Sequence, residues 1–249
     1  MVLAFPLRAS PLPVPNPAMP SVNGMDAAAS ALRYWERKQD IVANNLANVS
    51  TGAFKAQQVF ARLMDGARPA AETTSDLTVG TLRETGAPLD LAIDGPGFFV
   101  ASTSLGERYT RGGSLHLDAT HHLVDADGRQ LLGIKGPVAV DPAAGAITID
   151  HAGEVSQNGQ MIDRLRVESA SGADLMREGN ALFVPPSDRT LIAADDRAVK
   201  QGYLEESNVN SMGALVDMVA VQRAYASVQK AIVEMDKADE TATRLAKPV

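Results

Sequence analysis

Histidine and aspartate side chains are the candidates for a metal site in this sequence. Three histidines fall within seven residues and share that stretch with Asp118, and imidazole and carboxylate groups are common ligands of transition metals. In a β-strand, however, successive side chains point to opposite faces, so this spacing does not bring them into one ligand set. We expect no metal site among the four histidines, which are His116, His121, His122 and His151.

Two carboxylates and a glycine-rich turn are the remaining candidates for chemistry. Asp90 and Asp94 could serve as a general acid and base, but aspartate in such a context is expected to shape a turn. The sequence DGPGFF at 94–99 lacks the following helix with which glycine-rich loops bind phosphate. The chain has no cysteine and no HExxH, GxSxG, P-loop or GxGxxG motif. We therefore expect no catalytic residue, no cofactor and no enzymatic activity.

Charge and hydropathy narrow the classes of partner. The formal net charge is −7, whereas nucleic acids and anionic membranes select for clustered lysine and arginine. Residues 56–202 carry 13 basic and 20 acidic side chains, so this stretch alone accounts for the net charge. No apolar run approaches the roughly 18 residues of a membrane span. The composition predicts neither a nucleic-acid partner nor membrane insertion.

Prolines dominate the beginning of the chain. They stand at positions 6, 11, 13, 15, 17 and 20, which is too dense for a helix or a sheet strand. The basic region and uninterrupted apolar run of a secretory signal are missing. We expect residues 1–21 to be a disordered lead, or else the product of a start codon placed too early, with Met19 or Met25 as the true first residue.

A long helix is expected at the other end of the chain. From about Asn210 to Leu245 there is no proline and, after Gly213, no glycine. Roughly 35 helical residues would measure on the order of 50 Å, longer than a compact domain of this size requires. On a helical wheel two adjacent flanks are apolar. One flank contains Leu215, Val219, Ala226 and Val233, the other contains Met218, Val221, Tyr225, Val228 and Ile232, and a row of Gln222, Gln229 and Asp236 lies between them.

A second helical pattern runs from about Val22 to Asn48. Two rows of side chains at a spacing of seven form a seam of the kind that packs against another helix. Nearly three heptads are short for a coiled coil by itself, and chance spacing in an ordinary globular helix is the alternative. The comparable partner in the sequence is the C-terminal helix. The seam residues are Leu32, Trp35, Gln39, Val42, Leu46 and Val49.

Between the two helices the pattern changes to short alternating runs. Segments such as PVAV, AITID, RLRVES and ALFVP are separated by glycine, asparagine and aspartate, which is typical of antiparallel strands joined by hairpins. No helical segment of about 10–15 residues intervenes, so a βαβ arrangement is excluded. The expected fold is α+β. Terminal helices at 22–55 and 203–249 pair as a coiled-coil-like unit, 56–88 is an extended linker, and 89–202 is an antiparallel all-β domain.

The first helix ends in ANNLANVSTGAFK, residues 43–55. Asparagine tolerates the left-handed conformation and bonds its own backbone, so three asparagines within five positions are expected to end the helix. The string resembles the signature of bacterial flagellar rod and hook proteins. That family usually has glycine directly before the aromatic residue, which is Phe54 here. This chain has Ala53 at that position, so the local turn is expected to differ.

Two further stretches carry the same resemblance. GTLRETGAPLDLAIDGPGFFV at 80–100 is similar to the family segment L-D-x-A-I-x-G-x-G-F-F, and QGYLEESNVN at 201–210 resembles the lead into the family's C-terminal helix. At the turn between 109–118 and 122–133 glycine is expected, and the chain has His121, a residue type that tolerates positive φ. The residues that match the family motifs are Asn44, Asn45, Asn48, Phe54, Lys55, Leu89, Asp90, Gly95, Gly97 and Phe98.

The resemblance implies a structural protein. Family members are exported unfolded through the flagellar type III apparatus. They assemble with copies of themselves and with other rod and hook proteins into the basal-body rod, a helical tube that spans the periplasm and transmits torque. In them the terminal helices pair as an inner tube and the β domain forms an outer layer.

Applied to this chain, the resemblance implies a different packing partner for each of the two apolar flanks of the C-terminal helix. The seam of the N-terminal helix would meet the C-terminal flank that begins with Leu215, and the flank that begins with Met218 would meet neighbouring subunits. Within the family, the short 56–80 segment favours the proximal rod protein over the distal one.

Two alternatives belong to other classes of protein. A periplasmic enzyme that hydrolyses glycans would need two carboxylates at a defined separation, and the sequence nominates no such pair. A carbohydrate-binding module or an adhesin with a coiled-coil stalk is the other alternative. Adhesin stalks need continuous heptads, whereas here the helical pattern is split into two halves.

Overall fold

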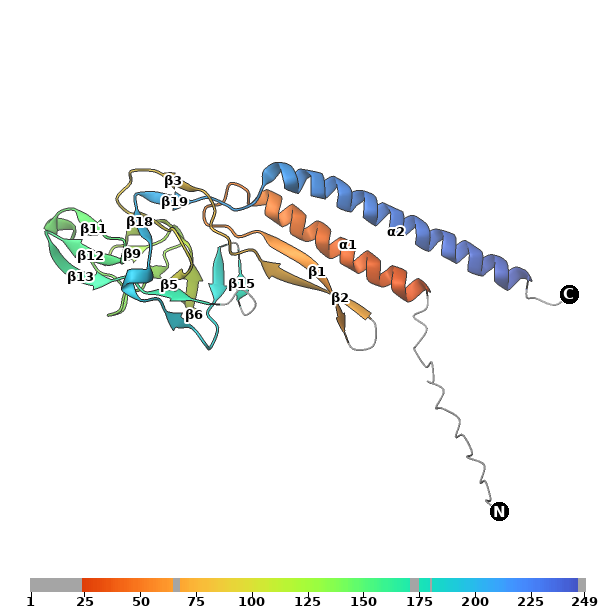
Figure 1. The fold of residues 1–249 in the computed structure, drawn as a ribbon, viewed down its shortest axis with the longest axis horizontal. Helices are drawn as coiled ribbons and strands as arrows, with labels where there is room; N and C mark the ends of the chain where they lie inside the picture. Colours follow the sequence, from red (N-terminus) through yellow and green to blue (C-terminus); the bar gives the residue numbers. More distant parts are fainter. Residues whose placement is uncertain (1–23, 65–67, 171–174, 180, 246–249) are drawn as a thin grey trace, which may run out of the picture.

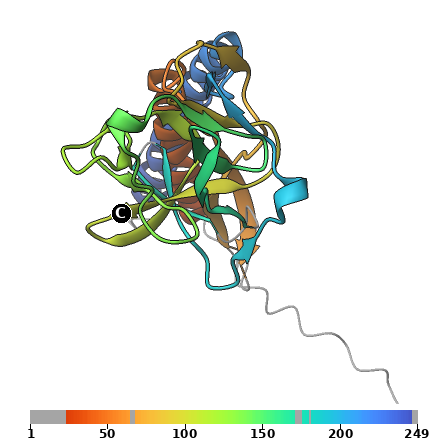
Figure 2. The same cartoon turned by 90° about the vertical axis from the view of Figure 1, so that its left-hand side faces the viewer.

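The computed structural model describes residues 24–64, 68–170, 175–179 and 181–245. Figure 1 shows an elongated molecule, with two helices side by side at one end and a β-rich body at the other. Seen along the long axis, the β-rich body lies in front of the helices (Figure 2). This arrangement confirms the α+β class. The lead expected at 1–21 lies outside the described residues.

Helix α1 (Gly24–Ala47) and helix α2 (Ser211–Leu245) run in opposite directions along one another (Figure 1). α1 is rich in alanine and has no proline and no glycine after its first residue, which favours a helix over its whole length. α2 begins after Asn210, whose Oδ1 accepts a hydrogen bond from the Gly213 N–H at 2.9 Å and so caps the first turn. Both boundaries agree closely with the expected ones.

Strands β1 (Gln57–Met64) and β2 (Arg68–Ser75) form an antiparallel hairpin that packs along α1. Residues 57–75 were expected to belong to the extended linker at 56–88 that the family resemblance implied. Pairing the two strands satisfies their backbone hydrogen-bonding groups, and the hairpin lies beside Ile41 and Asn45, both buried in α1. The segment therefore belongs to the helical part of the molecule. We call α1, α2 and the β1–β2 hairpin the helical unit.

The β domain runs from β3 (Leu82–Glu84) to β19 (Tyr203–Glu205), which pair with each other. Its largest sheet has the order β15-β16-β6-β5-β10-β9-β8, with β14 beside β5 and β17 beside β14. Two three-stranded sheets have the orders β11-β12-β13 and β18-β4-β7. All pairs among the described strands are antiparallel, as the short alternating runs predicted.

The other elements of the β domain are short. The strands are β4 (Asp90–Ile93), β5 (Phe98–Thr103), β6 (Gly106–Thr110), β7 (Gly112–Ser114), β8 (His116–Leu117), β9 (Leu123–Val124), β10 (Gln130–Leu131), β11 (Ile147–Ile149), β12 (Glu154–Gln157), β13 (Gln160–Arg164), β14 (Val167–Ser169), β15 (Met176–Glu178), β16 (Leu182–Val184), β17 (Thr190–Leu191) and β18 (Val199–Gln201). Two single turns of 3-10 helix, η1 (Pro142–Ala144) and η2 (Ala194–Asp196), lie among them.

Two apolar clusters form the core of the β domain. The larger is aliphatic apart from Phe99 and brings together β4, β5, β9, β10, β11, β12, β14 and β18. The smaller is aromatic. Its Phe98 ring stacks on Tyr109 at a centroid distance of 5.3 Å and touches Phe183 at 5.5 Å. These three rings lie where β5, β6 and β16 meet.

The turn expected at His121 is present and has a positive φ of 63°. Asp118 organises it, because one of its carboxylate oxygens accepts hydrogen bonds from the N–H groups of Thr120 at 2.7 Å and His122 at 2.9 Å. These bonds hold the pKa of the Asp118 carboxyl well below its usual value. Aspartate and histidine therefore shape a turn here, in place of the expected glycine.

Candidate functional site

The seam expected on α1 faces the interior of the helical unit. Leu32, Trp35, Gln39 and Leu46 are half-buried and Val42 is only 7% exposed. Val49 lies beyond the end of α1 and is also half-buried. All six seam residues are thus at least partly shielded from solvent.

The two apolar flanks of α2 are exchanged relative to the expectation. The flank assigned to neighbouring subunits is the one turned inward. Val221 is 1% exposed, and the other members of that flank are half-buried: Met218, Tyr225, Val228 and Ile232. Near the end of the same row, Sδ of Met235 would lie 3.9 Å from a Cβ placed on Gly24, so this row follows α1 to its beginning.

The flank assigned to intramolecular pairing faces outward. Leu215 and Val219 are each 48% exposed, Val233 is 49% exposed, and Ala226 is also exposed. The physical reason lies in the spacing. Met218, Val221, Tyr225, Val228 and Ile232 alternate steps of three and four, as the α1 seam does, whereas the other flank has steps of four, seven and seven. The row with steps of three and four presents more apolar side chains along one side of the helix.

The outward face of α2 carries more apolar area than its expected flank alone. Met212 is 70% exposed and Val216 is 62% exposed, and both lie close to Leu215 and Val219 in the first turns of α2. We call Met212, Leu215, Val216, Val219 and Val233 the outer face. Exposed apolar residues grouped on one helix commonly mark a protein interaction site.

The asparagines of the family motif fold the chain back at the end of α1. Asn45 pairs with the backbone of Gln57 in both directions, donating from Nδ2 to the carbonyl at 2.8 Å and accepting from the N–H at 2.9 Å. Asn48 donates from Nδ2 to the Asn44 carbonyl at 2.8 Å. Asn44 itself is exposed and contributes its carbonyl. The motif thus ends the helix, as expected, and also anchors the start of β1.

Ala53 and Phe54 form the turn in which this chain departs from the motif that it resembles. Ala53 has a positive φ of 59°, a conformation that favours glycine, and its N–H donates to the Glu205 carbonyl at 2.7 Å. Phe54 is fully buried, and the Arg177 guanidinium lies 4.0 Å from its ring centroid. Arg177 also donates to the Lys55 carbonyl at 2.7 Å, and burial lowers its pKa to about 10.

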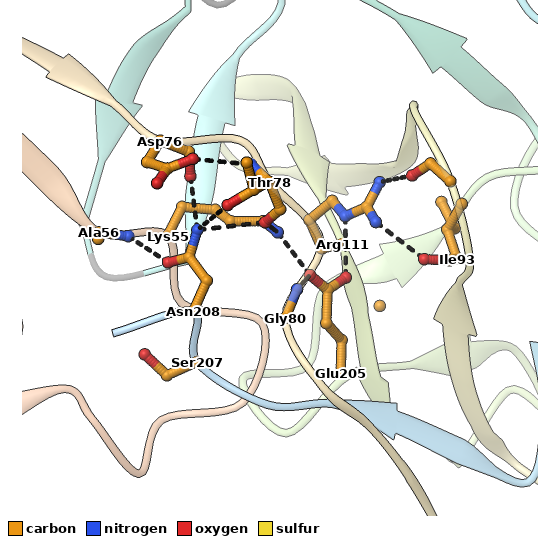
Figure 3. Close-up of polar contacts among 12 residues, drawn as sticks. Lys55, Ala56, Asp76, Thr78, Gly80, Ile93, Arg111, Glu205, Ser207 and Asn208 are labelled. Atoms are coloured by element: carbon orange, nitrogen blue, oxygen red, sulfur yellow. Dashed lines mark hydrogen bonds and ion pairs between the residues drawn. The ribbon is translucent and has the colours of Figure 1, made fainter. Parts of the chain in front are cut away.

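Behind that turn lies a buried ion cluster of Lys55, Arg111 and Glu205 (Figure 3). The Lys55 Nζ donates to one carboxylate oxygen of Glu205 at 2.5 Å, and the Arg111 Nε donates to the other at 2.9 Å. The three side chains are 0%, 2% and 1% exposed, respectively. Burial lowers the pKa of the Lys55 ammonium, and its hydrogen bond to Glu205 opposes that effect. We call these residues the Glu205 cluster.

Arg111 explains the glycines of the second family motif. It donates to the backbone carbonyls of Ile93 at 2.8 Å and Gly95 at 2.8 Å, and also to that of Gly97 (Figure 3). Gly97 has a positive φ of 111°, and an added Cβ would lie 2.5 Å from Cδ1 of Ile192, so a larger residue would be strained and would displace Ile192. The turn between β4 and β5 is thereby shaped around one guanidinium group.

The remaining motif residues support the same region. Asp90 accepts a hydrogen bond from the Thr85 hydroxyl at 2.6 Å, and Leu89 packs against the larger core. Asn208, which precedes α2, accepts from the Ala56 N–H at 2.7 Å and donates to the Asp76 carbonyl at 2.9 Å (Figure 3). Asp94, the second carboxylate considered for chemistry, pairs with Lys200 at 2.6 Å.

Sequence reasoning missed Arg111, Arg177, Glu205 and Asn208. Glu205 and Asn208 stand in YLEESNVN, a string recognised only as a lead into the last helix. Charged side chains are normally on the surface, and nothing local distinguishes Glu205 from its exposed neighbour Glu206. Their roles follow from contacts more than 90 residues apart in sequence.

The histidines are not part of a metal site in the described structure. Among the residues that the structure describes, no group of three or more histidine, aspartate or glutamate side chains could hold a metal ion. Within the same ranges, neither helix is both long and apolar enough to cross a membrane. The junction around Glu205 is a buried contact between segments of the chain, and the outer face is an exposed apolar surface.

Three protein-family models match this chain. The model described as "Flagella basal body rod protein" matches residues 25–55, the one described as "Flagellar hook protein FlgE/F/G D1 domain" matches 92–157, and the one described as "Flagellar basal body rod FlgEFG protein C-terminal" matches 200–245. These stretches contain α1 with its asparagine motif, much of the β domain, and β19 with α2.

Individual relatives are similar over most of their length. Flagellar basal-body rod protein FlgF of Caulobacter vibrioides is 31% identical over 223 residues, which are 84% of this chain and 91% of the relative. FlgF of Salmonella typhimurium is 31% identical over 245 residues, 89% of this chain and 95% of the relative. FlgG of Bacillus subtilis is 28% identical over 247 residues, 84% and 93% of the two chains.

These relatives are structural proteins, which overturns the alternatives of a glycan hydrolase and a carbohydrate-binding module. The family matches include both helices, the asparagine motif, the DGPGFF turn and the lead into α2. With similarity this extensive, the chain belongs to the flagellar basal-body rod proteins, and it is a structural component of the basal body that assembles with other rod and hook proteins, not an enzyme.

Proposed function

We propose that this protein is a subunit of the rod that joins its neighbours through the outer face of α2. The observation that carries the proposal is the exposure of five large apolar side chains on one side of a helix of 35 residues. Their burial against neighbouring subunits would contribute about 25 cal/mol for each Å² of apolar surface removed from water. Contacts of this kind between copies that do not close on themselves generate a helical assembly.

In this proposal α1 and α2 form a coiled-coil-like pair within one subunit. The α1 seam with Val42 meets the inward row of α2 with Val221, and the exchange of the two flanks leaves Leu215 and Val219 for the neighbours. The pair would form the inner layer of the tube and the β domain the outer one. The assembled rod would span the periplasm and transmit torque, after export of each subunit through the flagellar type III apparatus.

We assign the protein to the proximal type of rod protein. The support is the shortness of the segment between α1 and the β domain, where β1 and β2 make a hairpin confined to residues 57–75. Both FlgF and FlgG proteins are among the relatives at similar identity, so the length of this hairpin carries the assignment.

The experiment is a charge substitution on the outer face in cells that carry no other copy of the gene. Val219→Asp is expected to leave the β domain folded, as judged by near-ultraviolet circular dichroism of the purified protein, and to abolish incorporation into isolated basal bodies and motility. Ala231→Asp, at an exposed position of the same helix that is turned away from Val219 by about 120°, is the matched control and is expected to support motility. Normal motility of Val219→Asp would contradict the proposal.

A further inference from the structure

Three segments of chain meet where the helical unit joins the β domain. They are the turn 48–56 between α1 and β1, the segment 76–81 between β2 and β3, and the segment 206–210 between β19 and α2. Only the last two connect the helical unit to the β domain. Two covalent connections alone leave rotation at the junction open, so the relative orientation depends on the contacts made there.

The Glu205 carboxylate bonds to the turn after α1, to the segment after β2 and to the β domain. Oε1 of Glu205 accepts from Lys55 in the turn after α1 at 2.5 Å and from the Gly80 N–H in the segment after β2 at 3.0 Å. Oε2 accepts from Arg111, which belongs to the β domain and is itself fixed by three backbone carbonyls of the β4–β5 turn. Glu205 therefore bonds to the helical unit and to the β domain at the same time (Figure 3).

The backbone around this carboxylate leaves little room for movement. A Cβ on Gly80 would lie 2.0 Å from the Glu206 carbonyl oxygen, so the segments 76–81 and 206–210 are in direct backbone contact. The Lys55 Nζ also donates to the Thr78 carbonyl at 2.5 Å. Two buried cations share one carboxylate, and without it both would remain buried without their anionic partner.

We propose that the Glu205 carboxylate is a clamp that fixes the orientation of the helical unit relative to the β domain. Loss of the carboxylate charge drives water or a rearranged backbone toward Lys55 and Arg111, which opens the junction while the cores on either side stay packed. The clamp acts within a single subunit, so this inference goes beyond the proposed function and does not depend on it.

The absence of cysteine from the chain makes a direct measurement of this orientation practical. Spin labels are attached to Ala43→Cys on α1 and Gln160→Cys on β13, both exposed positions on opposite sides of the junction. A second pair, Ala126→Cys and Gln160→Cys, lies within the β domain and reports on its fold. Pulsed electron double resonance on the full chain gives the distance distribution for each pair.

The native chain is expected to give one narrow distribution for each pair. Glu205→Gln is expected to lose the narrow peak across the junction and to keep the one within the β domain. The matched control is Glu206→Gln, because Glu206 is the next residue and is exposed, with only a surface ion pair to Arg83. It is expected to keep both peaks.

Two results would overturn the clamp. One is a broad cross-junction distribution in the native chain, and the other is an unchanged narrow peak in Glu205→Gln. If Glu205→Gln also loses the peak within the β domain, the variant has disturbed the fold of that domain. Lys55→Met is then the test of the clamp, because it leaves the ion pair of Arg111 with Glu205 in place. Lys55→Met is expected to lose the cross-junction peak alone, and its retention would equally overturn the clamp. Because no assembly is measured, failure here is distinct from failure of the rod proposal.

Discussion

The N–H of Ala53 donates a hydrogen bond to the carbonyl oxygen of Glu205 at 2.7 Å, joining the turn after α1 to the last strand before α2. Ala53 makes this bond with a positive φ of 59°, at a position where the family usually has glycine. Alanine in the left-handed region costs roughly 1–2 kcal/mol, and the buried methyl group of Ala53 offsets part of that cost. The junction is thus built on a mildly strained residue.

Substitutions at Ala53 should reveal this strain. Ala53→Gly is expected to change the free energy of unfolding by less than about 1 kcal/mol, since relief of strain offsets the added freedom of the unfolded chain. Ala53→Val is expected to destabilise by more than about 2 kcal/mol, because a β-branched residue at positive φ is strongly disfavoured. Urea denaturation measures both. Ala43→Val, on the exposed side of α1, is the control, and an equal effect of valine at 43 and 53 would contradict the argument.

Gly97 should tolerate substitution far less than a glycine with similar dihedral angles and more space. Gly97→Ala places a Cβ 2.5 Å from Cδ1 of Ile192 and is expected to destabilise by about 2–3 kcal/mol. Gly113 also has a positive φ, of 144°, but has no atom within 4 Å of the added Cβ. Gly113→Ala is therefore the matched control, with an expected cost of about 1 kcal/mol. Equal melting temperatures for the two variants would rule out the steric explanation.

The Asp118 turn makes a prediction about pH. A carboxyl whose pKa is lowered on folding stabilises the protein above its unfolded pKa, and this contribution is lost as pH falls through that value toward the folded one. Asp118→Asn should therefore lower the melting temperature at pH 7, and the difference from the native chain should shrink as pH falls below about 4. Calorimetry between pH 7 and pH 3 measures the difference. A difference independent of pH would show that the charge of Asp118 is not the source of its effect.

Much of the fold follows from local patterns in the sequence. The boundaries of α2 could be predicted from the absence of glycine and proline after Gly213, and the β class from the short alternating runs. The β1–β2 hairpin could not, because strands rich in glutamine, arginine and threonine lack a clear alternation, and their pairing depends on α1 alongside.

Less of the candidate site than of the fold could be predicted from the sequence. A helical wheel identifies two apolar flanks on α2 but does not say which one meets α1. The alternating steps of three and four between Met218 and Ile232 were the available signal. Glu205 and Arg111 gave no such signal, because their pairing is set by the tertiary contact of β19 with the β6–β7 turn. The motif residues Asn45 and Lys55 were identified, and their partners Gln57 and Glu205 were not.

Thiol protection at two neighbouring positions of α2 measures whether neighbouring subunits cover the outer face, and the chain has no cysteine of its own to interfere. In the free protein, Val219→Cys on the outer face is expected to react rapidly with a maleimide, and Val221→Cys, at a position 1% exposed, slowly. In isolated basal bodies both thiols are expected to be protected, because neighbouring subunits cover position 219. A Val219→Cys thiol that reacts as fast in the assembled rod as in the free protein would contradict it.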